Sequence, residues 1–428
     1  MKKLISAVLI LTLLFTAAAC GKKDEGPSPE VQEQLEKGIA YLYAQGDGGY
    51  DKEQARECFE KAAEGGSADA YYYLGLIATR SNESGRYQKA MEYYEKAIEL
   101  GSGLGLLGKG ELYYMGAGVD RDFDQAVALY NEALEKGVPE ADYYLGKAYH
   151  YGLWEENDPA KAAEYYEKAL ESDSFACRNA ALTGMGRLYH EGSAFEQDDA
   201  KALEYYQQAA DAGYAGGYNR LGAAYEYGHG VEQSYEKAVE YYKKAAELGN
   251  TSAMVALGIL SHEGNGMEKN DQTALEWFEK AAAEGDAEGM DDIGYMYENG
   301  FAVEKDAKKA LEWYMNAAES GQARALNNIA VLYCNGVEGS ADYKKGLEYF
   351  EKAGNAGLNW ALANAAYIYV TGAGGVQTDY KKALELYKKA YALPDMPTEL
   401  DSHIKQMLNY MVDKGFVTKE EADSVFGS

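Results

Sequence analysis

Two short patterns contain residues whose types and spacing could perform chemistry. Ser234 and Lys237 have the Ser-x-x-Lys spacing of an activated serine nucleophile, but Ser234 stands where Asp122 stands in another copy of a repeat, a position that suits a helix cap. Residues 103–108 match a dinucleotide fingerprint, which requires a preceding strand, whereas residues 91–100 are predicted to be helical. We therefore predict no enzyme and no cofactor, and keep a cell-wall-related hydrolase as an alternative.

Histidines form the third candidate for chemistry. His150, His190 and His262 recur at or beside equivalent points of the repeat, and imidazole is a common zinc ligand. Helix axes pack about 8–10 Å apart, and each repeat contains two helices, so equivalent side chains in adjacent repeats start too far apart to share one ion. We predict surface histidines beside turns and no metal site.

These residues are positioned by a repeat of about 36 residues, which aromatic or apolar pairs mark. One ring of each pair is expected to pack between helices. The pairs are Cys58-Phe59, Tyr93-Tyr94, Leu129-Tyr130, Tyr165-Tyr166, Tyr205-Tyr206, Tyr241-Tyr242, Trp277-Phe278, Trp313-Tyr314, Tyr349-Phe350 and Leu386-Tyr387.

A second landmark precedes most pairs, as in Leu221-Gly222-x-x-Tyr225. Apolar residues at this spacing form one face of a helix. A mid-helix glycine costs about 1 kcal/mol relative to alanine, so its recurrence indicates a neighbour that a Cβ atom would obstruct. Loops such as Gly228-His229-Gly230 follow, and the next helix begins at a capping residue. The expected N-caps are Asp122, Asp158, Ser234 and Asp306.

The pattern Leu-Gly-x-x-Tyr, Gly-x-Gly-Val, Lys-Ala-x-x-Tyr-Tyr-x-Lys-Ala-Ala-x-x-Gly resembles the Sel1-like repeat family, relatives of tetratricopeptide repeats. The resemblance covers residues 30–395 and is strongest over 138–350, and the fifth unit has four extra residues within 172–179. It implies an all-α fold: a right-handed α/α superhelical solenoid of about ten helix-turn-helix repeats over 30–396. A capping helix pair is expected over 397–428, beginning near Thr398 and with a capping box at Thr418.

The N-terminal residues have the features of a targeting signal. Residues 1–19 have the basic, apolar and small-residue regions of a secretory signal, and Cys20 follows directly. This resembles a lipoprotein signal peptide, which implies lipidation of Cys20 and a polar tether over 20–29. We expect a bacterial membrane lipoprotein facing the periplasm or the cell exterior, with the choice between inner membrane, outer membrane and cell surface open.

Net charge limits the classes of partner, and the number of cysteines indicates their oxidation state. The formal net charge is −29 and basic stripes are absent from the sequence, which argues against a nucleic-acid partner, since that affinity depends on Lys and Arg clusters. Strong acidity also favours a monomer. Cys58, Cys177 and Cys334 are an odd number of distant residues, so we expect free, buried thiols.

A repeat array leaves a concave face, and the family resemblance implies an adaptor that binds a protein or peptide there. The resemblance also places the first helix of each repeat on that face. A cell-wall or glycan-binding module is the alternative that aromatic abundance suggests. The candidate contact residues are aromatics of first helices: Tyr71, Tyr72, Tyr143, Tyr144, Tyr218, Trp360 and Tyr367.

Overall fold

The computed structural model describes residues 27–45, 49–151, 157–320, 322–393 and 396–426. The expected signal sequence and Cys20 lie outside the described residues. None of the helices in the described part of the chain has the length and apolarity needed to cross a lipid bilayer. Within these ranges the fold is all-helical, as the repeat pattern predicts.

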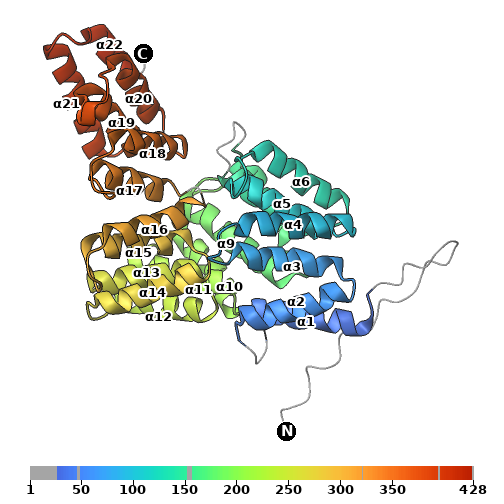
Figure 1. The fold of residues 1–428 in the computed structure, drawn as a ribbon. Coiled ribbons are helices and arrows are strands. Elements are labelled where there is room, and N and C mark those ends of the chain that lie inside the picture. The colour runs from blue at the N-terminus through green and yellow to red at the C-terminus, as the bar shows by residue number, and fades with distance from the viewer. Residues whose placement is uncertain (1–26, 46–48, 152–156, 321, 394–395, 427–428) are drawn as a thin grey trace.

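Ten helical hairpins follow one another and stack in sequence (Figure 1). Their first helices are α1 (Pro29–Leu42), α3 (Ala68–Thr79), α5 (Leu104–Met115), α7 (Ala141–Tyr151), α9 (Phe175–Glu191), α11 (Ala215–Tyr227), α13 (Thr251–Glu263), α15 (Ala287–Asn299), α17 (Ala323–Cys334) and α19 (Asn359–Thr371). Their second helices are α2 (Lys52–Glu64), α4 (Arg86–Glu99), α6 (Phe123–Glu135), α8 (Pro159–Ala169), α10 (Asp199–Asp211), α12 (Tyr235–Glu247), α14 (Asp271–Ala283), α16 (Ala307–Ala318), α18 (Tyr343–Asn355) and α20 (Tyr380–Ala392).

The mid-helix glycine makes room for an aromatic ring. A Cβ atom on Gly222 would lie 2.6 Å from Cδ1 of Tyr242, the second member of its aromatic pair. The same relation joins Gly294 to Tyr314, whose ring is fully buried. The predicted close approach is therefore confirmed, and the group that approaches is a side chain from the second helix of the same hairpin.

The predicted helix boundaries are confirmed by their caps. The side chains of Asp122, Asp158, Ser234 and Asp306 each accept a hydrogen bond from a backbone N–H in the first turn of the following helix. Six of the first helices in the described residues end at a glycine in the left-handed region, such as Gly228 at φ +77°, where a Cβ atom would be strained. Polar caps and glycine turns thus fix the length of most hairpins.

A helix pair closes the C-terminal end of the stack, as expected. It comprises α21 (Thr398–Asp413) and α22 (Lys419–Asp423), followed by the short 3-10 turn η2 (Ser424–Phe426). A second 3-10 turn, η1 (Ala373–Gly375), lies between α19 and α20. Leu400, Ile404 and Met411 of α21 are fully buried against the last hairpin. Thr418 and Glu421 form the predicted capping box of α22. The last repeat therefore does not expose its apolar face.

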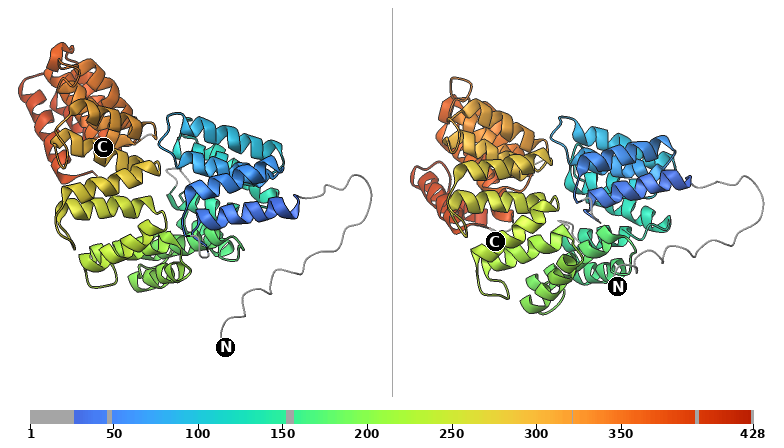
Figure 2. Two further views of the ribbon diagram at one scale, coloured as in Figure 1. Left: turned by 60° about the horizontal axis from the view of Figure 1, so that its bottom comes forward. Right: turned by 90° about the horizontal axis from the view of Figure 1, so that it is seen from below.

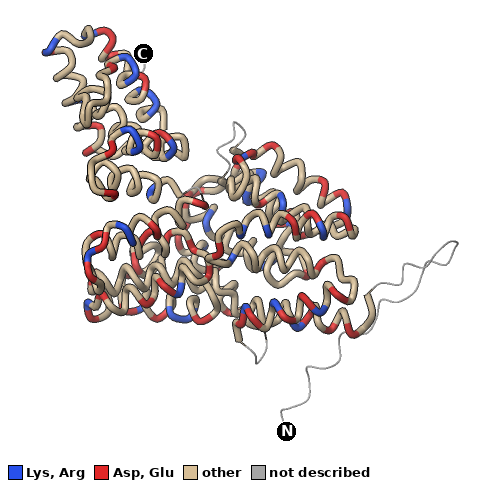
Figure 3. Tube along the Cα trace, viewed as in Figure 1, with Lys and Arg blue, Asp and Glu red and all other residues tan. Residues whose placement is uncertain are grey.

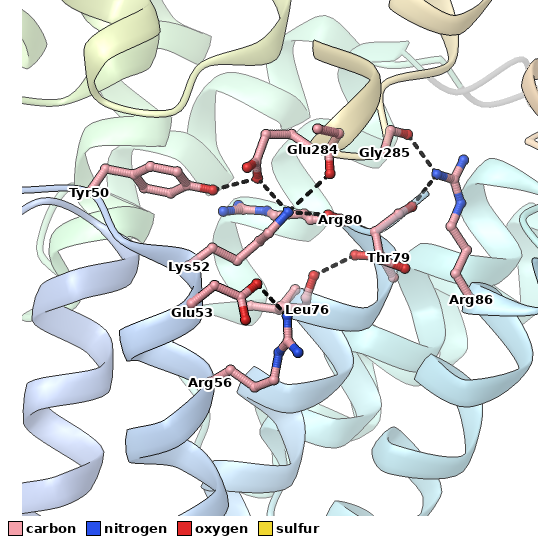
Figure 4. A network of polar contacts seen from close by, with 12 residues as sticks. Tyr50, Lys52, Glu53, Arg56, Leu76, Thr79, Arg80, Arg86, Glu284 and Gly285 are labelled. Carbon is pink, nitrogen blue, oxygen red and sulfur yellow. Dashed lines mark hydrogen bonds and ion pairs between the residues drawn. The ribbon is translucent and has the colours of Figure 1, made fainter. Parts of the chain in front are cut away.

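The first repeat contacts the seventh, because the stack curves back on itself. Figure 2 shows the helices following an arc that leaves α1–α4 beside α13–α16. The Tyr50 hydroxyl donates to Glu284 Oε2 at 2.6 Å, and Lys52 Nζ lies 3.0 Å from the same oxygen (Figure 4). Arg86 Nη1 donates to the backbone oxygen of Gly285 at 2.9 Å. The curved stack is therefore closed by polar contacts between distant repeats.

The four extra residues of the fifth repeat lengthen α9 by about one turn. This helix has 17 residues, whereas α11 and α13 have 13 each. Its N-cap is Ser174, and Phe175 is its first residue. The ring of Phe175 lies near those of Tyr43 and Tyr214, with centroids 6.5 and 6.2 Å away.

Candidate functional site

A cavity of about 420 Å³ lies on the inner side of the curve, among the N-terminal five repeats and the start of α11. Several first helices contact the first helix of the next repeat there, among them α3 with α5 and α7 with α9. Three of the predicted contact residues line the cavity, namely Tyr72, Tyr143 and Tyr144. The other aromatic lining residues are Tyr43, Tyr73, Phe175 and Tyr214.

The tyrosines of this cavity are held by one another. The hydroxyl oxygens of Tyr72 and Tyr144 lie 3.2 Å apart, although the two residues belong to the second and fourth repeats. The ring of Tyr144 packs 5.4 Å from Tyr130, and that of Tyr143 lies 6.1 Å from Tyr166. Burial raises the pKa of Tyr72 and Tyr144 well above the usual value, so these hydroxyls are neutral donors and acceptors.

Charged groups give the cavity polar character. Arg80 and Glu140 are half-buried lining residues. Burial raises the pKa of the Glu140 carboxyl, whereas a guanidinium remains charged at any physiological pH. The cavity therefore combines broad aromatic walls with one permanent cation. It can enclose an apolar or aromatic side chain and pair a carboxylate or carbonyl oxygen.

A second cavity of about 410 Å³ adjoins the first and shares Tyr43, Arg80, Phe175 and Tyr214 with it. Its far wall is formed by the turns that follow α12, α14 and α16, including Glu284 and Ser320. These are the turns that contact the first two repeats (Figure 4). Contact between the distant repeats therefore forms one wall of a second cavity, and both cavities remain partly open to solvent.

Four predicted contact residues lie elsewhere. The ring of Tyr71 packs 6.4 Å from that of Tyr93, and Tyr218 lies beneath the ammonium of Lys244 at 5.8 Å. Trp360 and Tyr367 are 37% and 43% exposed on α19, near the C-terminal cap. The structure thus brings together three of the seven predicted residues and separates the remaining four from them.

Four aromatic lining residues, namely Tyr43, Tyr73, Phe175 and Tyr214, were missed by the sequence prediction, although Phe175 and Tyr214 carry a signal. Phe175 belongs to the four-residue insertion, which the repeat alignment shows plainly. Tyr214 occupies the N-cap of α11, where Asn250 and Asp286 provide polar caps for α13 and α15. An aromatic residue at a capping position makes no cap hydrogen bond. Tyr43 follows the last residue of α1 and carries no comparable signal.

The short motifs have structural roles. Ser234 caps α12 by accepting from Lys237 N at 3.3 Å, and its hydroxyl lies 3.1 Å from Glu236 Oε2. Two glycines of the dinucleotide-like run pack against Tyr94: a Cβ atom on Gly105 would lie 2.6 Å from its backbone oxygen, and one on Gly108 would meet its ring at 2.2 Å. Among the described residues, the cysteines are free, and two of the three are buried as predicted. These motifs therefore serve packing and capping.

The outer rings of the aromatic pairs form stacks beneath lysines. Tyr189 and Tyr205 are stacked with centroids 5.8 Å apart, and Lys201 lies 4.1 Å above the Tyr189 ring. Tyr333 and Tyr349 repeat this arrangement with Lys345 at 4.0 Å. The Tyr189 ring also stacks on Phe195, with centroids 4.4 Å apart, so its contacts are made within the fold.

Charge is mixed along the helices. In the view of Figure 3, Lys and Arg alternate with Asp and Glu along both halves of the stack. Several of these form ion pairs, including Lys147 with Glu111 at 2.7 Å. Neighbouring opposite charges reduce each other's long-range electrostatic field. The described residues therefore form no continuous basic surface of the kind that binds a phosphate backbone.

Comparison with known proteins places these hairpins in a family. The Sel1 repeat model matches eight successive segments, and a tetratricopeptide repeat model matches residues 48–104. The Sel1 segments are 104–138, 139–174, 179–214, 215–250, 251–286, 287–322, 323–358 and 361–395. A comparison with curated proteins gave no match.

Solved structures include similar chains. The protein c5321, a protective antigen of uropathogenic Escherichia coli with an SLR fold, shares 30% identity at a TM-score of 0.48. The alignment covers 92% of this chain and 83% of that one. A Sel1 repeat protein from Oxalobacter formigenes shares 28% identity at a TM-score of 0.49, covering 60% and 99%. From the eight repeat matches and the 30% identity, we conclude that the chain belongs to the Sel1 repeat family.

Proposed function

We propose that this protein is a membrane-tethered scaffold outside the cytoplasm that binds a protein or peptide partner on the inner face of its solenoid. The repeat architecture suits protein interaction, and the observation that carries the proposal is the aromatic cavity around Tyr72, Tyr143 and Tyr144. Its volume falls within the range of about 300–1,000 Å³ that is typical of ligand-binding pockets.

The chemistry of the cavity favours a particular kind of segment. Aromatic walls contribute most binding free energy when they bury an apolar or aromatic side chain of the partner. Such a buried side chain is the usual centre of a protein interface. Arg80, at the border between the two cavities, would pair with a carboxylate or backbone carbonyl of the same segment. The partner is therefore expected to insert an apolar side chain flanked by an acceptor group.

The tether rests on the sequence of residues 1–29. Cleavage before Cys20 and lipidation of its sulfur would leave about nine polar residues before α1, which span about 30 Å when extended. Membrane fractionation of cells producing the chain or its Cys20→Ser variant tests this step. The variant should move to the soluble fraction, and its retention in the membrane would contradict the tether.

Site-specific photo-crosslinking in living cells tests the binding surface. A benzophenone amino acid at Phe175, in the cavity, should give a defined adduct with one partner, whereas the same group at Tyr241, on an outer stack, should not. Tyr214→Ala should reduce the Phe175 adduct at least tenfold, because this ring forms part of the wall but is not in the buried core. Equal adducts at both positions, or an adduct unaffected by Tyr214→Ala, would refute the site.

A further inference from the structure

Two histidines and one aspartate from three segments meet beside the fifth and sixth repeats. His190 is next to last in α9, Asp199 is the first residue of α10, and His229 lies in the loop between α11 and α12. His190 Nδ1 lies 2.6 Å from Asp199 Oδ1, and the two imidazole rings have centroids 4.5 Å apart. One potential ligand atom from each of the three side chains lies within 4.8 Å of the others.

The backbone holds His229 at this point. Gly228 and Gly230 on either side of it have φ values of +77° and +69°, which shape the turn. A Cβ atom on Gly230 would lie 2.9 Å from Cβ of Asp199 and 3.0 Å from its carbonyl carbon. The loop therefore rests directly on the first residue of α10, so the position of His229 beside Asp199 follows from backbone packing between repeats.

We propose that His190, Asp199 and His229 form a binding site for a divalent first-row transition-metal ion of the Zn²⁺ class. Imidazole nitrogen is a preferred ligand of zinc, copper and nickel, and one carboxylate completes a set of three protein ligands. Calcium and magnesium prefer oxygen ligands only, so this donor set selects against them. A fourth position remains for water or for a group from a bound partner.

The geometry requires a modest side-chain adjustment. In a tetrahedral site with metal–ligand bonds near 2 Å, ligand atoms lie about 3.4 Å apart. The side chain of His229 is exposed and can rotate, and His190 and Asp199 are half-buried. A bound ion would therefore connect α9 and α10 to the following repeat through the α11–α12 loop.

The seventh repeat contains a matched natural comparison. His262 Nδ1 lies 2.8 Å from Asp271 Oδ1, as in the fifth repeat, and the residue from the next loop is Phe301, with centroids 4.9 Å apart. His262 and Phe301 stand at the positions of His190 and His229. A histidine–aspartate pair therefore lies beside Phe301 in the seventh repeat, and the equivalent pair lies beside His229, the third candidate ligand, in the fifth repeat.

Isothermal titration calorimetry with Zn²⁺ on the full chain tests the site, in a Cys20→Ser background that removes the competing N-terminal thiol. The parent chain should bind one ion. His229→Phe, which copies the seventh repeat, should bind none, and Phe301→His should bind two. Co²⁺ in place of Zn²⁺ should give visible absorption bands in the parent and lose them in His229→Phe.

Folding controls accompany each variant. Thermal unfolding without metal should be unchanged in His229→Phe, because the side chain is exposed. Zn²⁺ should raise the Tm of the parent and of Phe301→His, and should leave the Tm of His229→Phe unchanged. An unchanged stoichiometry of one in His229→Phe would overturn the assignment, as would the absence of Zn²⁺ binding to the parent at 100-fold molar excess over the protein.

Discussion

Lys52 Nζ lies 3.0 Å from Glu284 Oε2, although the first residue belongs to the first repeat and the second to the seventh. Both side chains are largely buried, with 12% and 17% exposure. Tyr50 donates to the same carboxylate, and Arg86 and Tyr87 bind Ser320 nearby. A solenoid usually has contacts only between neighbouring repeats, so this contact couples segments that would otherwise unfold independently.

Lys52→Met should therefore open the stack. Removing one partner of a buried ion pair leaves an uncompensated charge and costs about 3–5 kcal/mol. We expect a larger radius of gyration in small-angle X-ray scattering and earlier unfolding of the N-terminal repeats. Lys345→Met is the matched control, because its pair with Glu338 is more exposed and joins residues of one hairpin. Identical scattering from the parent and both variants would show that the contact does not hold the curve closed.

Gly222→Ala should destabilise the sixth repeat, because its new Cβ atom would lie 2.6 Å from the buried Tyr242 ring. Overpacking costs about 1–3 kcal/mol, against which the better helix propensity of alanine offsets up to about 1 kcal/mol. Chemical denaturation of Gly222→Ala, Tyr242→Leu and the double variant measures the coupling. The double variant should lose less than the sum of the single losses; strict additivity would contradict the packing relation.

Ser234→Ala should cost about 1 kcal/mol of stability through loss of the cap of α12. Ser234→Asp should retain the stability of the parent chain, because aspartate performs the same role for α10 and α16. Denaturation curves of the three chains check this. A hydrolase that used Ser234 as its nucleophile would lose turnover in both variants, so a β-lactam turnover assay on the same samples separates the two roles.

Asp292 should make stability depend on pH. Burial raises the pKa of its carboxyl to about 7, and its Oδ2 atom is buried without a hydrogen-bond partner in the structure. The folded chain then binds this proton more tightly than the unfolded chain, so stability is lost as pH rises from about 4 through 7. Asp292→Asn should remove about 2–4 kcal/mol of that loss.

Thermal unfolding between pH 5 and pH 8 measures this effect. The Tm of Asp292→Asn should exceed that of the parent at pH 8 by more than it does at pH 5. Asp120→Asn, at an exposed loop position, provides the control and should follow the parent. A parallel fall in Tm for all three chains would show that Asp292 does not carry the dependence.

The local fold follows from sequence because each hairpin repeats the same physical requirements. Gly222 recurs at a fixed position in copy after copy, so a close approach at this glycine can be predicted without coordinates, and the structure identifies the approaching group as the Tyr242 ring. The caps at Asp122 and Ser234 are equally local, since they involve residues three positions away. The periodicity of the sequence therefore predicts the caps and packing contacts within each hairpin.

Contacts between distant repeats do not follow in this way. The curvature of the stack is the sum of a small rotation at each repeat. No short sequence motif therefore predicts that Lys52 and Glu284 lie in contact. The cavity depends on the same sum: Tyr71 and Tyr72 are neighbours on α3, and only Tyr72 faces Tyr144. The histidine pair was missed for a different reason. His190 meets His229, which lies at a different position of the repeat, so the spacing between equivalent positions of adjacent repeats does not apply to this pair.

The longer α9 also shows how such an array can vary. Four residues rotate a helix by about 400°, which returns the following residues to within about 40° of their original direction. The face that α9 presents to its neighbours is thus nearly preserved, while Phe175 is added at its tip. Inserting one helical turn into a first helix can therefore add a side chain to the cavity while the order in which the helices stack stays the same.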